Sequence, residues 1–242
     1  MDNILITGAS GMLGKELKKV FPNSKNLNGK KDLDLTDLNF INKNLPFNYD
    51  IIIHAAAYTN MQYNEKYPTK AYNLHSEIVP ILQSKCKKLI YISAQGKDYN
   101  KVYFKSKLKG EEYSLRREED LVIRTNIYGK GGLSKWAFTE LKQNNTINGY
   151  VNSMFNAIHV KQLAECIREN LLKEKGLISV AGNYMLSKYD FIKYIAEILN
   201  LNENNIKKHY LEHDEDLVID LKDIDYRFSL SEGMSILKSE LI

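Results

Sequence analysis

The chain has 242 residues, of which 43% are hydrophobic and 26% charged, and it contains 16 Tyr, 8 Phe and one Trp. This composition excludes an intrinsically disordered protein and predicts one large domain, or a core with a smaller lobe. No apolar run approaches ~18 residues, and no basic stretch precedes an apolar one at the start, so we expect no membrane span and no signal peptide. The net charge is +4, but the basic residues are scattered and only five are Arg, which argues against a nucleic-acid partner.

The first half of the chain alternates short apolar runs with segments of helical spacing. Strands are predicted at residues 3–7, 24–28, 50–55, 89–93 and 121–124, and helices at residues 12–20, at residues 71–82 and between the last two strands. This alternation predicts parallel βαβ units and therefore an α/β fold with a Rossmann-type doubly wound parallel sheet. In such sheets the ligand binds beyond the carboxyl ends of the strands.

The second half of the chain has a looser pattern. Helices are predicted at residues 133–141, 160–171 and 187–199, the last one opened by the capping pair Ser187 and Asp190, and a strand at residues 177–180. No Pro/Gly-rich linker separates the halves. We therefore predict a dinucleotide-binding core at residues 1–128 and, at residues 129–242, a small interwoven C-terminal substrate lobe with elements that return to the core.

A glycine-rich loop follows the first predicted strand, with Gly8, Gly11 and Gly14 in the spacing G-x-x-G-x-x-G. In this arrangement the first glycine allows a tight turn, the second lets backbone N–H groups approach a pyrophosphate, and the third lets the helix pack on the strand. The positive end of the helix then faces the phosphates. The loop therefore predicts a dinucleotide-binding site.

The predicted helix after the fourth strand carries Tyr103 and Lys107, four residues apart. Residues at this spacing share one face of a helix. An ammonium group near a phenol favours the phenolate and lowers the tyrosine pKa, which suits proton donation to a carbonyl oxygen. In a lysine-rich chain this pair alone is weak evidence, and it gains weight only together with the glycine loop.

Together, these motifs resemble the extended short-chain dehydrogenase/reductases, and within them most closely the dTDP-4-dehydrorhamnose reductase family of nucleotide-sugar reductases. The matching pieces are TGASGMLG (7–14), DLDLTD (32–37), IHAAAYT (53–59), YN (72–73), YFKSK (103–107), VIRTNIYG (122–129), IHVKQLA (158–164), LISVAGN (177–183) and KYDF (188–191). The resemblance extends from residue 1 to about residue 195. It implies a Rossmann fold, a nicotinamide cofactor and a nucleotide-linked 4-keto-deoxy sugar as substrate, in surface polysaccharide or deoxysugar biosynthesis.

The resemblance also implies roles for individual residues. Tyr103 would protonate the keto oxygen, and Lys107 would contact the ribose and hold down the tyrosine pKa. Thr125 and Asn126 would approach the nicotinamide. The cofactor-binding residues implied by motif and resemblance, the two lysines considered below included, are Gly8, Ser10, Gly11, Met12, Leu13, Gly14, Lys30, Lys31, Asp34, Leu35, Ala55, Ala56, Ala57, Tyr58, Tyr103, Lys107 and Asn126.

The chain departs from the family pattern after the fourth strand. Ser93, Ala94 and Gln95 stand where the family has a Ser-Thr-Asp run, so an alanine occupies the place of the catalytic hydroxyl. The segment between this run and Tyr103 is also short. Successive strand residues point to opposite faces, so if the strand continues regularly, neither Ser93 nor Gln95 can replace the hydroxyl missing at Ala94. We favour the alternative, in which the strand bends near Gly96 and turns the Ser93 hydroxyl toward the substrate as the third catalytic group. The sugar itself is not indicated by the sequence.

The cofactor type depends on the loop after the second predicted strand. An acidic residue at the strand end favours NAD(H), whereas basic groups favour the 2′-phosphate of NADP(H). Here Lys30 and Lys31 come before the first acid, Asp32. NADP(H) is therefore the predicted cofactor, with NAD(H) as the alternative.

The remaining residues indicate no metal. His209 and His213 are four residues apart but lack a cysteine or H-E-x-x-H partner, and His54 is expected to be a hydrogen-bonded structural residue. Cys86 and Cys166 are expected to be small core residues on helix faces, and so few cysteines suit a reducing cytoplasm. Two other functions stay open, an epimerase of the same superfamily and a catalytically inactive cofactor-binding regulatory subunit, and so does a homodimer.

Overall fold

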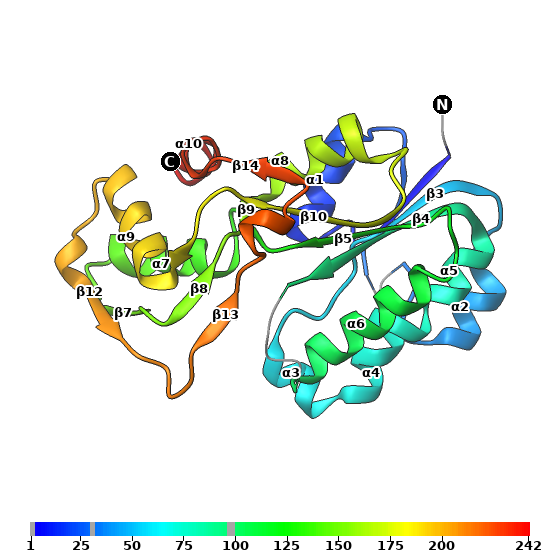
Figure 1. Cartoon of the computed structure of the whole chain (residues 1–242), viewed down its shortest axis with the longest axis horizontal. Helices are drawn as coiled ribbons and strands as arrows, with labels where there is room; N and C mark the ends of the chain where they lie inside the picture. Colours follow the sequence, from blue (N-terminus) through cyan, green and yellow to red (C-terminus); the bar gives the residue numbers. More distant parts are fainter. Residues whose placement is uncertain (1–2, 30–31, 96–99) are drawn as a thin grey trace. The chain divides into compact units, whose positions relative to one another are not determined.

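A parallel sheet of seven strands is the central element of the chain. A computed structural model describes residues 3–29, 32–95 and 100–242, and within them the strand order is β14-β10-β5-β4-β3-β1-β2 (Figure 1). The strands are β1 (Ile4–Thr7), β2 (Lys25–Leu27), β3 (Tyr49–His54), β4 (Cys86–Ala94), β5 (Leu121–Thr125), β10 (Gly176–Gly182) and β14 (Tyr226–Phe228). The predicted Rossmann-type fold is confirmed.

The registers bring the ends of the first strands to one edge. Residue Thr7 of β1 lies opposite Leu27 of β2 on one side and opposite His54 of β3 on the other, and each of these residues is the last of its strand. Because parallel strands end at the same edge of a sheet, the three loops that follow them meet there.

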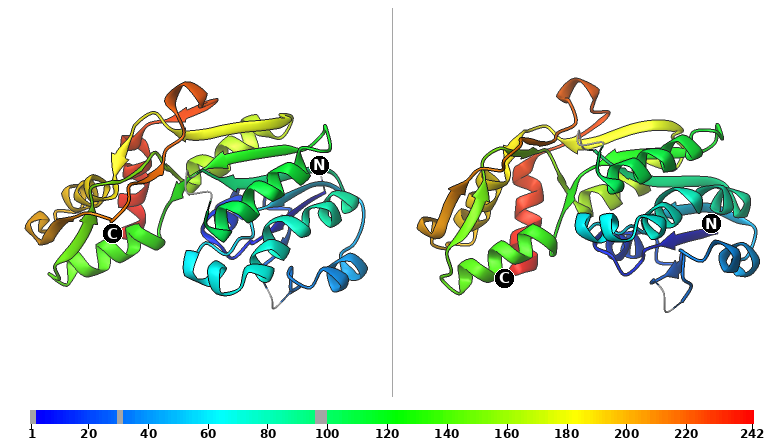
Figure 2. Two further views of the ribbon diagram at one scale, coloured as in Figure 1. Left: turned by 60° about the horizontal axis from the view of Figure 1, so that its bottom comes forward. Right: turned by 90° about the horizontal axis from the view of Figure 1, so that it is seen from below.

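Helices cover both faces of the sheet in the first half of the chain. Helix α1 lies on one face, and the helices α2, α5 and α6 lie on the other (Figures 1 and 2). A buried apolar cluster packs α2 and α5 onto β1, β3 and β4 through Leu5, Ile41, Ile52, Leu82 and Leu89. The helical segments here are α1 (Met12–Val20), α2 (Leu38–Asn44), α3 (Met61–Lys66), α4 (Pro68–Tyr72), the π-helix η1 (Asn73–Glu77), α5 (Val79–Lys85) and α6 (Val102–Ser114).

The chain divides into two units. The first is formed by Met1–Ala94, Tyr99–Arg124 and Ala164–Ile178, and the second by Gln95–Asp98, Thr125–Leu163 and Ser179–Ile242. Residues 164–178 of the second half of the chain thus belong to the first unit. The single boundary between residues 128 and 129 stays a prediction.

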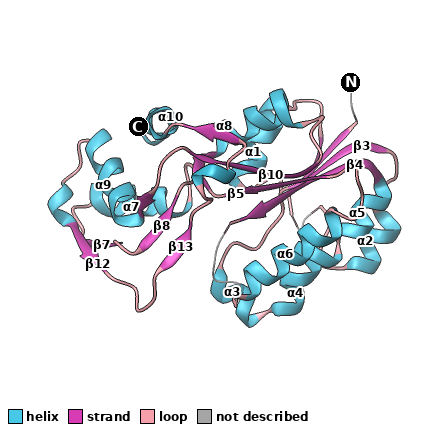
Figure 3. Cartoon of the chain, viewed as in Figure 1, coloured by secondary structure: helices cyan, strands magenta, loops and turns pink. Residues whose placement is uncertain are grey.

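The described strands outside the central sheet are short, and Figure 3 distinguishes strands from helices by colour. The strands are β6 (Ile127–Tyr128), β7 (Ile147–Tyr150), β8 (Ser153–Phe155), β9 (Ile158–His159), β11 (Leu186–Ser187), β12 (Ile206–His209) and β13 (Glu215–Leu217). The helical segments are α7 (Gly132–Lys142), α8 (Val160–Cys166), α9 (Lys188–Ile198), α10 (Leu230–Leu241), the π-helix η2 (Ile167–Leu171) and the 3-10 turns η3 (Glu203–Asn205) and η4 (Leu221–Asp223). Ser187 caps α9 by accepting the Asp190 N–H at 3.0 Å, which confirms the capping pair.

Two details differ from the sequence predictions. The predicted helices at residues 71–82 and 160–171 each contain a π-helical segment, which apolar spacing does not reveal. Cys86 is the first residue of β4 and not part of a helix face, whereas Cys166 is buried in α8 as expected. Among the described helices, none has the length and apolarity needed to cross a membrane.

Candidate active site

The glycine loop joins β1 to α1 in the way its spacing predicts. Gly8 has a φ of +68°, and a Cβ there would lie 2.7 Å from backbone atoms of Ala56. A Cβ on Gly14 would lie 2.2 Å from the Gly8 carbonyl oxygen, so α1 starts directly against the loop. Gly11 is exposed at the N-cap of α1, and its Cβ would meet only the Gly8 carbonyl oxygen, at 3.1 Å. Gly8 and Gly14 therefore serve the fold, whereas Gly11 leaves the helix N-terminus open to a ligand.

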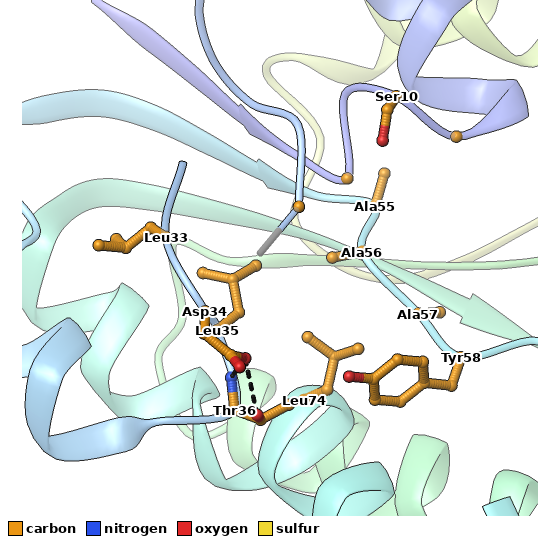
Figure 4. Close-up of a pocket in the computed structure, with 13 residues that line it drawn as sticks. Ser10, Leu33, Asp34, Leu35, Thr36, Ala55, Ala56, Ala57, Tyr58 and Leu74 are labelled. Carbon is orange, nitrogen blue, oxygen red and sulfur yellow. Dashed lines mark hydrogen bonds between the residues drawn. The ribbon is translucent and has the colours of Figure 1, made fainter. Parts of the chain in front are cut away.

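A pocket of about 230 Å³ lies where the loops after β1, β2 and β3 meet (Figure 4). Small side chains from Ala55, Ala56 and Ala57 form one wall, and Tyr58 points into the space (Figure 4). The thirteen residues that line it are Gly8, Ser10, Gly11, Gly29, Leu33, Asp34, Leu35, Thr36, Ala55, Ala56, Ala57, Tyr58 and Leu74. The pocket thus occupies the carboxyl edge of the sheet, where sequence reasoning placed the cofactor.

Nine of the predicted cofactor-binding residues line this pocket: Gly8, Ser10, Gly11, Asp34, Leu35, Ala55, Ala56, Ala57 and Tyr58. The pocket walls also include Gly29, Leu33, Thr36 and Leu74, which the sequence did not single out. Of the other predicted residues, Leu13 and Gly14 are buried beneath the loop and Met12 is 36% exposed on α1. Lys30 and Lys31 lie outside the described residues.

The acidic residues after β2 are engaged with their own loop. Asp32 accepts the backbone N–H of Asn28 at 2.7 Å and its side-chain amide at 2.9 Å, and these two bonds lower the pKa of its carboxyl. Asp34 accepts the backbone N–H of Thr36 at 3.0 Å and its hydroxyl at 2.7 Å (Figure 4). The residue directly after β2 is Asn28, and not the acid that favours NAD(H) at a strand end.

Tyr103 and Lys107 lie in the first two turns of α6. Lys107 is buried, donates from Nζ to the Ile92 carbonyl at 2.6 Å, and places its ammonium 4.5 Å from the centre of the Tyr91 ring. Burial lowers the pKa of Lys107 to about 7, against the opposing effect of Glu111. Burial also raises the pKa of Tyr103 to about 12, so the lowering predicted from the four-residue spacing is not found.

Ser93 does not have the orientation predicted from the sequence. Strand β4 continues through Ala94, and the buried Ser93 hydroxyl donates to Glu111 Oε1 at 2.6 Å. Arg124 contacts the same carboxylate through Nε at 3.0 Å and Nη2 at 2.6 Å. In this structure a charge-assisted bond holds the Ser93 hydroxyl on α6, and the catalytic role of Ser93 stays a prediction. The predicted bend at Gly96 lies outside the described residues.

His54 connects β1 to Leu74, which lines the pocket. Its Nε2 donates to the Leu74 carbonyl at 3.0 Å, so Nδ1 accepts a bond from the Thr7 hydroxyl at 2.8 Å. Burial lowers the pKa of His54 to about 3, and its ring stays neutral at physiological pH. The expected structural role of His54 is confirmed.

The chain shows clear similarity to known proteins. A family model described as the RmlD substrate binding domain matches residues 1–213. The chain belongs to this family. A spore coat polysaccharide biosynthesis protein, SpsK, of Bacillus subtilis is 27% identical over 81% of this chain and 79% of its own length. A dTDP-4-dehydrorhamnose reductase of Aggregatibacter actinomycetemcomitans is 28% identical over 79% of this chain and 77% of its own.

Solved structures agree with the family. A hypothetical dTDP-4-dehydrorhamnose reductase from Sulfolobus tokodaii has a TM-score of 0.80 at 28% identity, covering 96% of this chain and 98% of its own. A Bacillus anthracis dTDP-4-dehydrorhamnose reductase in complex with NADP has a TM-score of 0.84 at 23% identity, covering 99% of both chains. The resemblance inferred from the motifs is thus confirmed.

Asn126, which was also predicted to bind the cofactor, lies in the second unit of this RmlD-family chain. Its side-chain amide donates to the Leu217 carbonyl, and its own carbonyl accepts the Ile158 N–H at 2.9 Å. Neighbouring Thr125 is buried.

The second unit also has a pocket of about 700 Å³ with Trp136 and Tyr150 in its wall, which sequence reasoning missed. Within the described part of the chain, no group of His, Cys, Asp and Glu is arranged to hold a metal.

Proposed function

We propose that the protein is an NADPH-dependent reductase of a nucleotide-linked 4-keto-deoxy sugar, in deoxysugar and surface polysaccharide biosynthesis. One observation carries this function. The first unit contains both the pocket at the ends of β1 and β3 and the pair Tyr103 and Lys107 on α6, the helix that follows β4. Family membership and the names of the reductase relatives support the substrate class. The reaction runs in the cytoplasm, and a homodimer is part of the proposal.

The residues present fit the cofactor. The loop has no room for a side chain at Gly8, Gly11 is exposed beside it, and the N-terminus of α1 offers backbone N–H groups to a pyrophosphate. Asp34 and Leu35 would hold the adenine side, and Ala55 to Tyr58 the ribose side. When bound, the nicotinamide supplies the hydride that reduces the keto carbon.

Tyr103 supplies the proton that the new alcohol needs. With a pKa of about 12, its hydroxyl is protonated throughout the physiological range and is ready to donate to a keto oxygen. Lys107, fixed on the Ile92 carbonyl, lies on the same helix face and contacts the ribose in this proposal, and below its pKa of about 7 it is an ammonium. A cation near a developing phenolate stabilises it, which makes the proton transfer easier.

NADPH is the proposed cofactor rather than NADH. The carboxylate of Asp32 accepts two bonds from Asn28 on Oδ2 and is thereby tied to its own loop, which supports this choice. In the proposal, Lys30 and Lys31 bind the 2′-phosphate instead.

The function is tested by mixing the purified protein with NADPH and dTDP-4-dehydrorhamnose and following the absorbance of the reduced cofactor. Wild type should consume NADPH in proportion to sugar reduced, and Tyr103→Phe should turn over ~10²-fold more slowly while still binding NADPH. An epimerase would interconvert sugars without net loss of NADPH. Interconversion of sugars without loss of NADPH would refute the proposed reaction. Equal turnover by the wild type and Tyr103→Phe would refute it as well.

A second candidate is a cofactor-binding regulatory subunit without catalysis. It is favoured by Ala94 and by the engagement of Ser93 with Glu111, which together leave β4 without a hydroxyl for the keto oxygen. Loss of one such donor typically costs ~10²–10³-fold in turnover. If wild type binds NADPH but is inactive, and Ala94→Thr creates activity, this second function replaces the first.

A further inference from the structure

We propose that His75 is a positioning residue that ties the cofactor pocket to the helix carrying Tyr103. The inference rests on the proposed function, because it assigns His75 a part in that same site. The imidazole lies between two segments that both have functional residues: the loop at Tyr58, which lines the pocket, and the first turns of α6. Neither the motifs nor the family resemblance assigned it a role.

The hydrogen bonds of His75 fix both the position and the tautomer of its ring. The backbone N–H of Tyr58 donates to Nε2 at 3.0 Å, so Nε2 carries no proton. Nδ1 is then the protonated nitrogen and donates to the Ser106 hydroxyl at 2.8 Å. Ser106 in turn donates to the backbone carbonyl of Tyr103 at 2.9 Å. One side chain thus links the pocket loop to the catalytic turn through three consecutive bonds.

Only the neutral ring can make these bonds. An imidazolium has no acceptor, so protonation would leave the Tyr58 N–H without its partner. The ring is fully buried, and burial, together with the charge of Lys107, holds the pKa of His75 well below its usual range. The linkage therefore persists at every pH at which the enzyme is expected to work.

The backbone of His75 is held as firmly as its ring. It lies in the π-helix η1, a rare local geometry that often occurs at functional sites. The Tyr91 hydroxyl donates to the His75 carbonyl at 2.7 Å. A Cβ on Gly110 would lie 2.2 Å from that carbonyl oxygen, so α6 approaches η1 as closely as a glycine permits.

The ring of His75 also touches Tyr103 directly. The two ring centroids are 5.6 Å apart and the planes meet at 86°, an edge-to-face contact. The imidazole therefore holds Tyr103 twice, through its ring and through the bond from Ser106 to its carbonyl. Small displacements of a catalytic group reduce rate strongly, so this double hold bears on turnover and not only on stability.

Three variants separate the two halves of the linkage. In His75→Gln, the side-chain oxygen can still accept from the Tyr58 N–H, but the donor to Ser106 is lost. In His75→Asn, the amide can still donate to Ser106, but the acceptor for Tyr58 is lost. His75→Phe keeps a ring of similar shape and loses both bonds.

The first measurement is amide hydrogen exchange at Tyr58, which needs no ligand. His75→Phe and His75→Asn should accelerate exchange of this N–H about tenfold or more, the effect of losing one ordinary hydrogen bond, and His75→Gln should not. The second is a fluorescence titration with NADPH, in which Kd should rise about tenfold for the same two variants. The third is kcat at saturating NADPH, which should fall for His75→Phe and His75→Gln.

A matched control is Gln83→Leu. Gln83 anchors the other end of α6 by donating to the Tyr113 carbonyl at 3.1 Å and to Asp120 at 2.7 Å, so its loss should destabilise the same helix far from the pocket. This variant should lower the melting temperature without changing the NADPH Kd or kcat. If His75→Phe behaves in the same way, or if the Gln and Asn variants do not divide the effects, His75 has only a structural role and the inference is wrong.

The outcomes also separate this inference from the proposed function. A wild-type protein that binds NADPH but reduces no keto sugar refutes the reductase function, and exchange and NADPH binding then decide the role of His75. An active wild type with unchanged exchange, Kd and kcat in all three variants refutes the role of His75 alone.

Discussion

The buried ammonium of Lys107 should make the stability of the protein depend on pH in a way that one substitution removes. Lysine has an ordinary pKa of 10.5, and burial lowers the pKa of Lys107 to about 7. Between these two values the unfolded chain binds a proton that the folded protein has released. Stability from this group therefore rises as pH increases through that window.

The size of the effect follows from the two pKa values. Linkage gives about 2 to 3 kcal/mol of added stability between pH 6 and pH 9 for this single group. The groups that face the ammonium do not reverse the sign of this pH dependence. His54 has a pKa of about 3 and that of His75 is well below its usual range, so both stay neutral, and Glu111 remains paired with Arg124.

Lys107→Met is the informative change because it removes the charge and keeps the length of the side chain. Urea unfolding of both proteins at pH 6 and pH 9 gives four free energies. At each pH, the free energy of unfolding of wild type is subtracted from that of the variant. This difference should be about 2 to 3 kcal/mol larger at pH 6 than at pH 9. Packing differences between Lys and Met cancel in this comparison.

Lys109→Met is the matched control on the same helix. Its ammonium pairs with Glu77 at 2.6 Å, and this bond raises its pKa, so both folded and unfolded chains keep the proton between pH 6 and pH 9. Its substitution should change stability equally at the two pH values. An equal change for Lys107→Met as well would refute the claim that the fold penalises the charge at Lys107.

Three further outcomes are expected. Gly11→Val should abolish NADPH binding with little change in melting temperature, because its Cβ meets only the Gly8 carbonyl oxygen, at 3.1 Å; a titration with wild-type affinity would contradict this. Replacing Lys30 and Lys31 together by Ala should weaken NADPH much more than NADH, and equal losses in the two titrations would argue against a 2′-phosphate contact. Ser93→Ala should reduce stability by about 1–3 kcal/mol, because it leaves Glu111 short of one buried donor, with turnover per folded molecule nearly unchanged.

The sheet and the cofactor pocket were predictable because their sequence signals are local. A short run of β-branched residues such as Ile51, Ile52 and Ile53 favours a buried strand, and the glycine at position 8 marks the turn that follows the first strand. The π-helical turn at His75 was not predictable, because a single π turn within a helical apolar pattern has no sequence signal of its own. The residues that complete the pocket wall, such as Leu33 and Leu74, come from loops that only the fold brings together.

The orientation of Ser93 shows a different limit of sequence reasoning. The regular alternation of a strand predicts that Ser93 and Ala94 point to opposite sides of β4. The motif-based expectation then required Ser93 to leave its side, because a hydroxyl was missing at Ala94. What holds it is Glu111, eighteen residues away and paired with Arg124, and no local pattern reveals such a partner.

Helix α6 shows why the proposed catalytic pair, Tyr103 and Lys107, was visible as a motif although the buried face of the helix was not. The residues that it buries are mainly polar, namely Ser106, Lys107, Gly110, Glu111 and Ser114 besides Phe104, so the apolar stripe that marks an inward helix face is absent. Burying such a face is stable only because each polar group has a defined partner. Those partners are the His75 ring, the Ile92 carbonyl and the Ser93 hydroxyl. A helix that breaks the apolar rule on its buried side is what a catalytic face requires, because the groups that act on a substrate must be polar and must be held in place.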